Sequence, residues 1–106
     1  MIVEYIRYRI TDAARRGEFE DAYTRASQQL DLAPECQGYE LTHGIEEPER
    51  YILRIVWTSV AEHEQGFRHG PCFPPFLAEI RPYIGDIEEM KHYEHTAVTS
   101  AVGGQS

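Results

Sequence analysis

The segment that decides the fold of this chain is YILRIVWTSVAEHEQGFRHGPCFPPFLAEI, residues 51–80. It opens with an apolar, β-branched run that ends in Trp57, which is typical of a buried strand. The Ser-x-x-Glu pattern at 59–62 is that of a capping box and predicts that a helix begins there. Gly-Pro at 70–71 ends that helix, and Pro-Pro at 74–75 fits only the first turn of another, because proline lacks the backbone N–H. The segment therefore predicts a strand followed by a helix that is split in two.

The two short helices each carry an apolar stripe. Val60, His63 and Phe67 follow the spacing i, i+3 and i+7, which brings them to one side of a helix. Phe76 and Leu77 provide the apolar face of the second helix. We therefore expect both helices to face the sheet, with a pocket between them and the strands.

The N-terminal part of the chain predicts a strand and a long helix. Residues 2–10 are rich in β-branched and aromatic side chains and alternate imperfectly. One face of this strand has Ile2, Ile6, Tyr8 and Ile10, and the other has Val3, Tyr5, Arg7 and Arg9. Asp12 is a suitable N-cap for a helix over about 13–31, which stops before Pro34.

The remaining segments predict a hairpin, a last strand and a tail. Residues 39–45 alternate strictly, and a polar turn joins them to the strand at 51–57. Residues 83–93 predict the last strand, which is acidic, and the Gly/Ser/Thr/Ala-rich tail over 96–106 is expected to be mobile. We expect residues 1–95 to form one domain.

The resulting order β-α-β-β-α-β is that of the α+β, ferredoxin-like fold, a four-stranded antiparallel sheet with helices on one face. The uncovered face carries a mixture of apolar and charged side chains, which favours a second copy of the sheet as its cover. We therefore predict a homodimer in the form of an α+β barrel. Arg54 and Glu40 are predicted to lie in its interface, where they form a polar contact.

Composition excludes several partners. Eighteen acidic residues against ten basic ones give a net charge of −8, which disfavours nucleic acid and anionic membranes. The chain starts directly in a strand pattern without a signal-peptide pattern, so we expect a cytoplasmic protein. Cys36 and Cys72 could in principle pair, but two free thiols is the preferred interpretation in a reducing compartment.

Four stretches together resemble the antibiotic biosynthesis monooxygenase family. They are the opening VEYIRYRI, the run ILRIVWTS, the following EHEQGFRHGPCFPPFLAEIRPYI and the closing IEEMKHYE. The resemblance covers about residues 1–95. It implies a dimeric α+β barrel, but not one chemistry, because relatives include cofactor-free quinone-forming oxygenases, haem-degrading enzymes and proteins without a known reaction.

The haem-degrading branch can be tested by residue. That branch has a Trp in the helix after the Trp-Ser hinge, a ligand His beyond the Gly-Pro break, and an Asn on the first strand. The matching helix positions here are Phe67 and Leu77, and the first strand contains no Asn. Haem degradation of that type is therefore disfavoured, although His63 or His69 could reach an iron from another angle.

The cofactor-free branch needs only a dry aromatic pocket, a proton acceptor and dioxygen, so no cofactor is expected. His63 is the candidate general base, because partial burial on an apolar helix face keeps an imidazole neutral. The candidate substrate-binding residues are Trp57, Phe67, Phe73, Phe76, Tyr23, His43 and His69. Each could instead be a core or surface residue.

The five histidines lack a paired helical spacing, so no metal site is predicted. Three functions remain open. The first is a cofactor-independent monooxygenase acting on a phenol or quinol. The alternatives are a non-catalytic dimeric module that binds a small ligand or regulates a partner, and an isomerase or lyase activity as found in related barrels.

Overall fold

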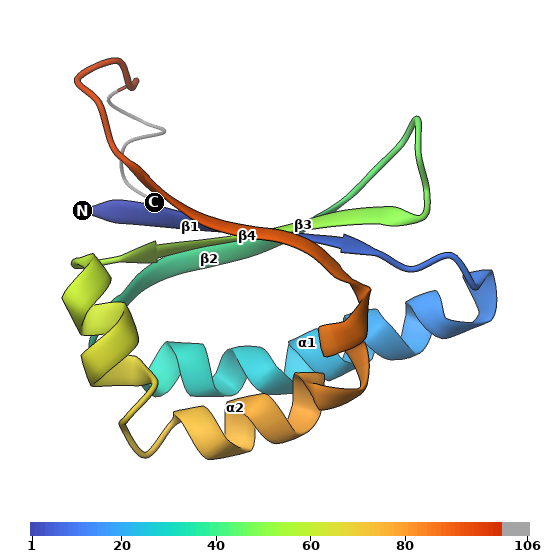
Figure 1. The fold of residues 1–106 in the computed structure, drawn as a ribbon, viewed down its shortest axis with the longest axis horizontal. Coiled ribbons are helices and arrows are strands. Elements are labelled where there is room, and N and C mark those ends of the chain that lie inside the picture. Colours follow the sequence, from blue (N-terminus) through green and yellow to red (C-terminus); the bar gives the residue numbers. More distant parts are fainter. Residues whose placement is uncertain (101–106) are drawn as a thin grey trace.

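The computed structural model describes residues 1–100. The order of its elements confirms the predicted fold (Figure 1). In chain order they are β1 (Ile2–Arg9), a 3-10 turn (Ala13–Arg15), α1 (Arg16–Leu32), β2 (Cys36–His43), β3 (Arg50–Trp57), a π-helix (Glu62–Phe67), α2 (Phe73–Ile80), a 3-10 helix (Arg81–Asp86) and β4 (Ile87–Glu94). The predicted mobile tail lies partly outside the described residues, because these end at residue 100.

The four strands form one antiparallel sheet in the order β2-β3-β1-β4. Both α-helices, the π-helix and the 3-10 helices lie on one face of the sheet, and within residues 1–100 no helix covers the other face (Figure 1). The register sets Glu4 of β1 opposite Ile55 of β3 on one side and His92 of β4 on the other. Two polar residues far apart in the sequence are thereby cross-strand neighbours.

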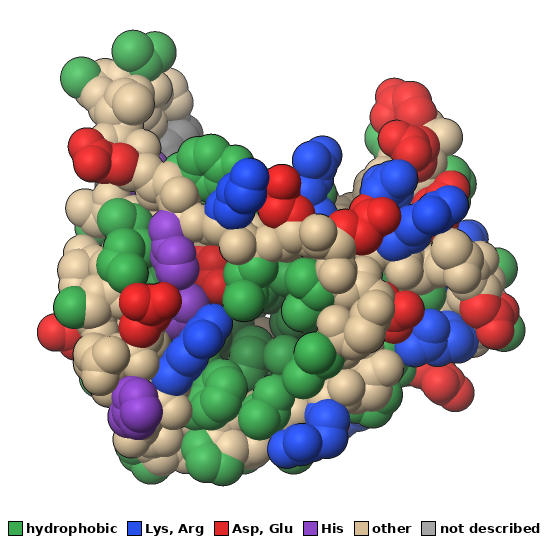
Figure 2. Space-filling view, in the orientation of Figure 1, with side chains coloured by type: hydrophobic (Ala, Val, Ile, Leu, Met, Phe, Trp, Pro, Cys, Tyr) green, Lys and Arg blue, Asp and Glu red, His purple; other side chains and the backbone are tan. Residues whose placement is uncertain are grey.

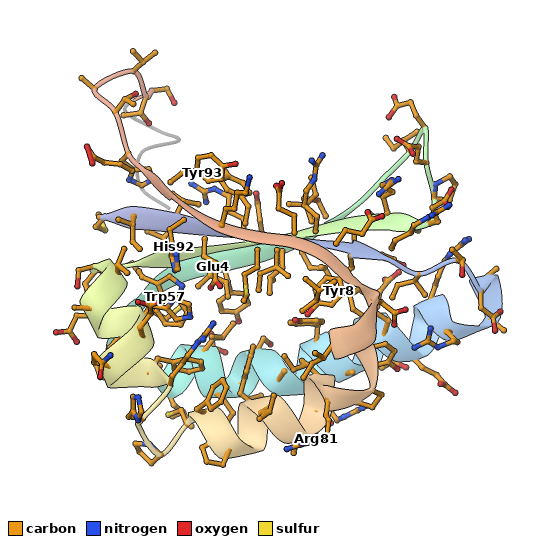
Figure 3. The ribbon with its side chains drawn as sticks, in the orientation of Figure 1. Glu4, Tyr8, Trp57, Arg81, His92 and Tyr93 are labelled. Atoms are coloured by element: carbon orange, nitrogen blue, oxygen red, sulfur yellow. The ribbon has the colours of Figure 1, made fainter. Side chains whose placement is uncertain are left out.

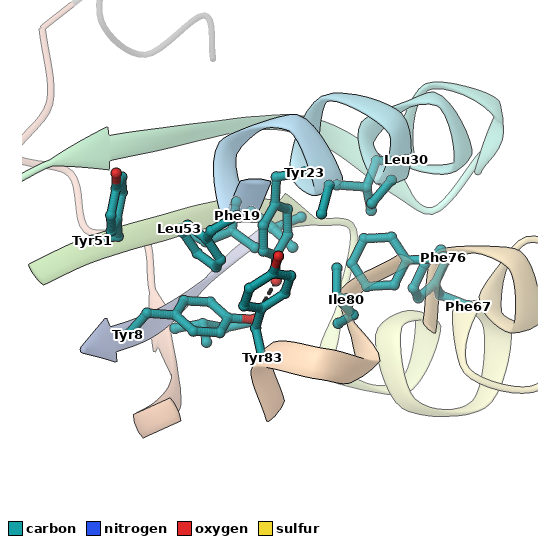
Figure 4. Close-up of a cluster of buried hydrophobic side chains, with 14 of the residues drawn as sticks. Tyr8, Phe19, Tyr23, Leu30, Tyr51, Leu53, Phe67, Phe76, Ile80 and Tyr83 are labelled. Atoms are coloured by element: carbon teal, nitrogen blue, oxygen red, sulfur yellow. Dashed lines mark hydrogen bonds between the residues drawn. The ribbon is translucent and has the colours of Figure 1, made fainter. Parts of the chain in front are cut away.

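An aromatic cluster joins α1 to the sheet. Phe19 of α1 is fully buried, and its ring packs against Tyr8, Tyr51 and Tyr83 at centroid distances of 4.8, 4.8 and 5.1 Å. The hydroxyls of Tyr8 and Tyr23 form a hydrogen bond within this cluster (Figure 4). Edge-to-face contacts of this kind add to the stabilisation that burial gives, so α1 is held firmly against one end of the sheet.

Three local expectations were wrong. Ile45 was expected on the face of a strand, but β2 ends at His43 and Ile45 is 88% exposed in the hairpin loop, where Gly44 N–H bonds to Arg50. Val60 was expected on the buried stripe and is 39% exposed, because the turn that follows widens into a π-helix. Tyr83 was expected in a strand, but it enters the core from a 3-10 helix.

The split helix begins and breaks where the sequence predicted. The Glu62 N–H donates to Ser59 Oγ at 3.0 Å, which is half of the expected capping box. At the break, a Cβ on Gly70 would lie 2.8 Å from the Gly66 carbonyl oxygen, closer than real Cβ contacts. Only glycine fits that approach, and the chain then turns into α2.

The face of the sheet without helices has a mixed character. Tyr5 and Tyr93 are in edge contact on it, at a centroid distance of 5.4 Å. Figure 3 shows Tyr93 on the side of the sheet away from the helices. Arg54 of β3 is directly opposite Glu40 of β2, as the sequence suggested. Among the described residues, no helix is both long and apolar enough to cross a bilayer.

Candidate functional site

A cavity of about 220 Å³ lies between the sheet and the split helix. Figure 2 shows its mouth as a hollow ringed by hydrophobic side chains, with histidine and acidic side chains at one end. Most of its wall is apolar, and the lining residues are Glu4, Ile6, Tyr8, Ile55, Trp57, His63, Phe67, Arg68, Phe73, Phe76, Leu77, Ile80, Ile84, Ile87 and Met90. An apolar cavity with a few convergent polar groups is the usual form of a small-molecule site.

The polar end of the cavity consists of three side chains, one from each of three elements, that contact one another in a row. His63 Nε2 lies 3.5 Å from Glu4 Oε1, and His63 Nδ1 lies 2.8 Å from His92 Nε2. Glu4 is 1% and His63 3% exposed, whereas His92 is only partly buried. Figure 3 shows Glu4, Trp57 and His92 gathered beneath the sheet, with Tyr8 further along the cavity.

Trp57 holds two of these three side chains in place. Its indole N–H donates to Glu4 Oε1 at 3.0 Å. Its ring is stacked on His63, with centroids 4.5 Å apart and 13° between the planes. Since Trp57 is the last residue of β3 and is itself fully buried, the sheet determines where the carboxylate and the imidazole lie.

The π-helix determines the backbone position of His63. The Arg68 N–H donates to the His63 carbonyl at 3.1 Å, an i→i+5 bond that widens the turn. In this wider turn, His63 and Phe67 are both buried against Trp57. Single π-turns occur frequently at functional sites.

Burial changes the charges at this end of the cavity. Burial, together with the charges of Arg68 and His92, lowers the pKa of His63 to about 4, so its imidazole is neutral at pH 7. Burial raises the pKa of Glu4, while the hydrogen bond from Trp57 opposes that rise. The imidazole of His63 is therefore unprotonated but a weaker base than a free imidazole, whereas the raised pKa of Glu4 makes its carboxylate a stronger base than usual, so the two groups together can accept a proton from a bound ligand.

Five of the predicted site residues are brought together. Trp57, His63, Phe67, Phe73 and Phe76 all line the cavity, although their roles in binding or chemistry remain predictions. The two aromatic pairs Phe67–Phe73 and Phe67–Phe76 are in edge contact, at 5.7 and 5.4 Å. Phe73 and Phe76 belong to the wall that α2 contributes, and Phe67 to the part contributed by the π-helix.

Three predicted residues lie elsewhere. Tyr23 lines a separate hollow between α1 and β2, and its hydroxyl is bonded to Tyr8. His43 stacks on Tyr51 with centroids 4.2 Å apart, on a part of the sheet remote from the cavity lining. His69 is exposed in the helix break and is not among the lining residues. Sequence proximity to apolar residues did not indicate which way these side chains point.

The sequence reasoning missed Glu4, Tyr8 and His92 as site residues. A signal was present for Glu4, because it alternates with Ile2, Ile6 and Tyr8 and so falls on the inward face of the first strand. A carboxylate in that position cannot be a solvated surface charge. The position of His92 beside it depends on the pairing of β1 with β4, which no local pattern indicates.

Glu4, His63 and His92 also provide a possible metal-ligand set. One donor atom from each lies within 4.8 Å of the other two. The expectation of no metal site relied on spacing along the chain, and it did not consider ligands that come together from separate strands and a helix. The cavity cannot hold haem as the haem-degrading branch does. The positions of that branch's helix Trp and ligand His are occupied here by Phe67 and Leu77, which line the cavity without offering a ligand atom.

The family model for antibiotic biosynthesis monooxygenases matches residues 1–72. The chain belongs to this family. Among curated proteins, it is 26% identical over 81 residues to the uncharacterised protein YczJ of Bacillus subtilis, a match that spans 73% of this chain and 81% of YczJ.

Solved structures of the same family share the fold. An antibiotic biosynthesis monooxygenase candidate from Bordetella bronchiseptica superposes with a TM-score of 0.72 at 24% identity, covering 90% of this chain and 96% of that one. SnoaB, a cofactor-independent oxygenase from Streptomyces nogalater, superposes with a TM-score of 0.67 at 19% identity, covering 94% and 95%. At these identities the likeness establishes the fold alone.

Proposed function

We propose that the protein is a cofactor-independent monooxygenase that oxidises a small phenol or hydroquinone with dioxygen. The observation that carries this proposal is the cavity itself, an apolar, aromatic-walled space with Glu4 and the neutral His63 at one end. Such a site can bind an aromatic ring, keep it dry and take its hydroxyl proton. The cofactor-independent oxygenase SnoaB, which has the same fold, adds support from outside this chain.

The reaction would begin with deprotonation. A phenol with a pKa near 10 is a poor electron donor until it loses its proton, and the phenolate can then reduce dioxygen directly. For a phenol with a free para position, one oxygen atom becomes the second carbonyl of a quinone and the other leaves as water, so the atoms balance without an added reductant. The protein's part is to supply the base and to exclude bulk water.

The hydrogen-bonded pair of histidines suggests a route for the proton. His63 is buried at the cavity wall, whereas His92 is partly exposed on the edge strand β4. A proton accepted by His63 can pass across the 2.8 Å contact to His92 and from there to solvent. This returns the base to its neutral form for the next turnover.

The size of the cavity limits the substrate class. A cavity of about 150 Å³ accommodates benzene in a well-studied protein, and the cavity here is about 220 Å³. This favours substrates with one ring or two fused rings over larger polycyclic compounds. Tyr8 lines the cavity away from Glu4, and its hydroxyl is bonded to that of Tyr23.

Oxygen consumption tests the proposal. Chelator-treated protein should take up dioxygen with one- or two-ring phenols that have a free para position, such as 1-naphthol, and release the quinone without hydrogen peroxide, whereas a three-ring anthrone should be a poorer substrate. Autoxidation without protein is subtracted. Saturable ligand binding without oxygen uptake would reject the oxygenase and favour the non-catalytic binding module. Conversion of a ligand to an isomer under nitrogen would favour isomerase activity.

We also infer that two copies associate through the uncovered face of the sheet. On that face Tyr5, Ile52 and Tyr93 form a partly exposed apolar patch, which is flanked by Arg7 and Glu89. Glu40 and Arg54 lie at its side as direct cross-strand neighbours. A second sheet packed on this face would bury the patch and produce the α+β barrel.

A further inference from the structure

We infer that Glu4, His63 and His92 form a binding site for a divalent transition-metal ion of the Zn²⁺ type. Two imidazoles and one carboxylate are a ligand set used for Zn²⁺ and for non-haem Fe²⁺. The three residues come from β1, the π-helix and β4. The site goes beyond the proposed metal-free oxygenase.

The geometry of the first two ligands suits an ion. Zinc binds nitrogen and oxygen at about 2.0–2.2 Å, so the donors of a tetrahedral ion are about 3.4 Å apart. His63 Nε2 and Glu4 Oε1 are 3.5 Å apart and need little adjustment. Both side chains are almost fully buried and both are held by Trp57, through a hydrogen bond to Glu4 and ring stacking on His63.

The third ligand is the movable one. His92 Nε2 faces His63 Nδ1 at 2.8 Å, and one donor atom from each of the three residues lies within 4.8 Å of the others. Rotation of His92, which is partly exposed on an edge strand, would bring it to the ion. The same exposure gives an ion a path from solvent.

The electrostatic balance can be tested as well. Glu4 supplies the negative charge, while the guanidinium of Arg68 acts on both Glu4 and His63 and opposes a bound cation. Arg68 is exposed. Within residues 1–100, the hydrogen bond that its side chain makes is a long one of 3.9 Å to Met90 Sδ. It can therefore swing into solvent when an ion binds, and its removal should strengthen binding.

The inference is tested by titrating Zn²⁺ into untagged protein in the absence of substrate and measuring the heat of binding by calorimetry. We expect one ion per chain. His92→Gln and Glu4→Gln should each weaken binding at least tenfold, Arg68→Gln should strengthen it, and the matched control His43→Gln should leave it unchanged. His92→Gln alters a partly exposed edge position, so its fold can be verified by circular dichroism. Equal binding by wild type and His92→Gln, or the absence of saturable binding, would overturn the site.

A Co²⁺ spectrum distinguishes the ligands. The histidine and carboxylate set gives visible d–d bands without intense sulfur-to-metal charge transfer. Strong near-ultraviolet charge transfer would place the ion on Cys36 or Cys72, which are free thiols, and would reject the site. Neither measurement requires turnover, so failure of the metal site and failure of the oxygenase proposal are separate results. If both proposals hold, adding Zn²⁺ should suppress metal-free oxygen uptake.

Discussion

Trp57 and His63 form a stacked pair, with ring centroids 4.5 Å apart and planes inclined by 13°. The same indole donates its N–H to Glu4. One residue at the end of β3 therefore orients both candidate proton acceptors of the cavity, and it does so without contacting solvent. The arrangement makes Trp57 a positioning residue as well as a wall of the site.

Replacing Trp57 by Phe should separate these two contributions. The variant keeps an aromatic ring against His63 but leaves the Glu4 oxygen without its donor. Loss of one partner of a buried hydrogen bond costs about 1–3 kcal/mol, which chemical denaturation can measure. Oxygen uptake should fall as well. Unchanged stability together with unchanged turnover would mean that Glu4 is held by other contacts.

Replacing His63 by Gln should reduce turnover while preserving most of the stability. Glutamine fills much of the imidazole volume and retains a hydrogen-bonding group, but it cannot act as a base at neutral pH. General-base catalysis contributes about 10²- to 10⁴-fold, and kcat should fall within that range. His69→Gln, in the exposed helix break, is the matched control. A variant that loses melting temperature but not rate would show that His63 is a core residue.

A larger side chain at Leu77 should narrow the substrate range. Leu77 is half-buried on α2 and lines the cavity, so Leu77→Phe reduces the available volume. We expect KM for two-ring phenols to rise several-fold while one-ring substrates are still accepted. Ala78→Leu, at an exposed position of the same helix, provides the control. If both substrate classes are affected equally, the ligand does not occupy this part of the cavity.

Arg54→Glu should weaken association of the proposed dimer. The substitution sets two carboxylates side by side on the face that a second sheet would cover, and burying charges without a counter-ion between two sheets is costly. Light scattering across a dilution series should show a larger monomer fraction than in wild type, with the same far-ultraviolet spectrum. Glu62→Lys, on the exposed helical side of the molecule, should have no such effect. A wild-type protein that is monomeric at micromolar concentration would remove the basis for the barrel.

The buried tyrosine pair predicts a loss of stability in alkali. Burial raises the pKa of Tyr8 to about 12 and raises the pKa of Tyr23 as well. Above pH 10 the unfolded chain releases these protons while the folded chain retains them, so the free energy of unfolding falls as pH rises. The Tyr8→Phe/Tyr23→Phe double variant removes both hydroxyls together and should show a shallower decline between about pH 9 and 11. An identical slope would exclude this pair as the cause.

The sequence by itself determined the order of elements and most of their ends. Proline and glycine act locally, so the helix break at Gly70 and the start of α2 could be predicted from residues next to them. The apolar, β-branched run likewise indicated that β3 is a buried strand ending in Trp57. The aromatic wall of the cavity followed from these local rules, because helical and strand periodicity determine which side of an element is buried.

Only the tertiary structure decided the chemistry at the end of the cavity. Glu4 and His92 are 88 positions apart in the numbering (92 − 4) and become neighbours through the antiparallel pairing of β1 with β4. His63 joins them because a π-turn, which no local pattern indicated, directs it toward Trp57. Contacts of this kind depend on strand register and on the direction of single side chains, and these are set by the packing of the whole domain.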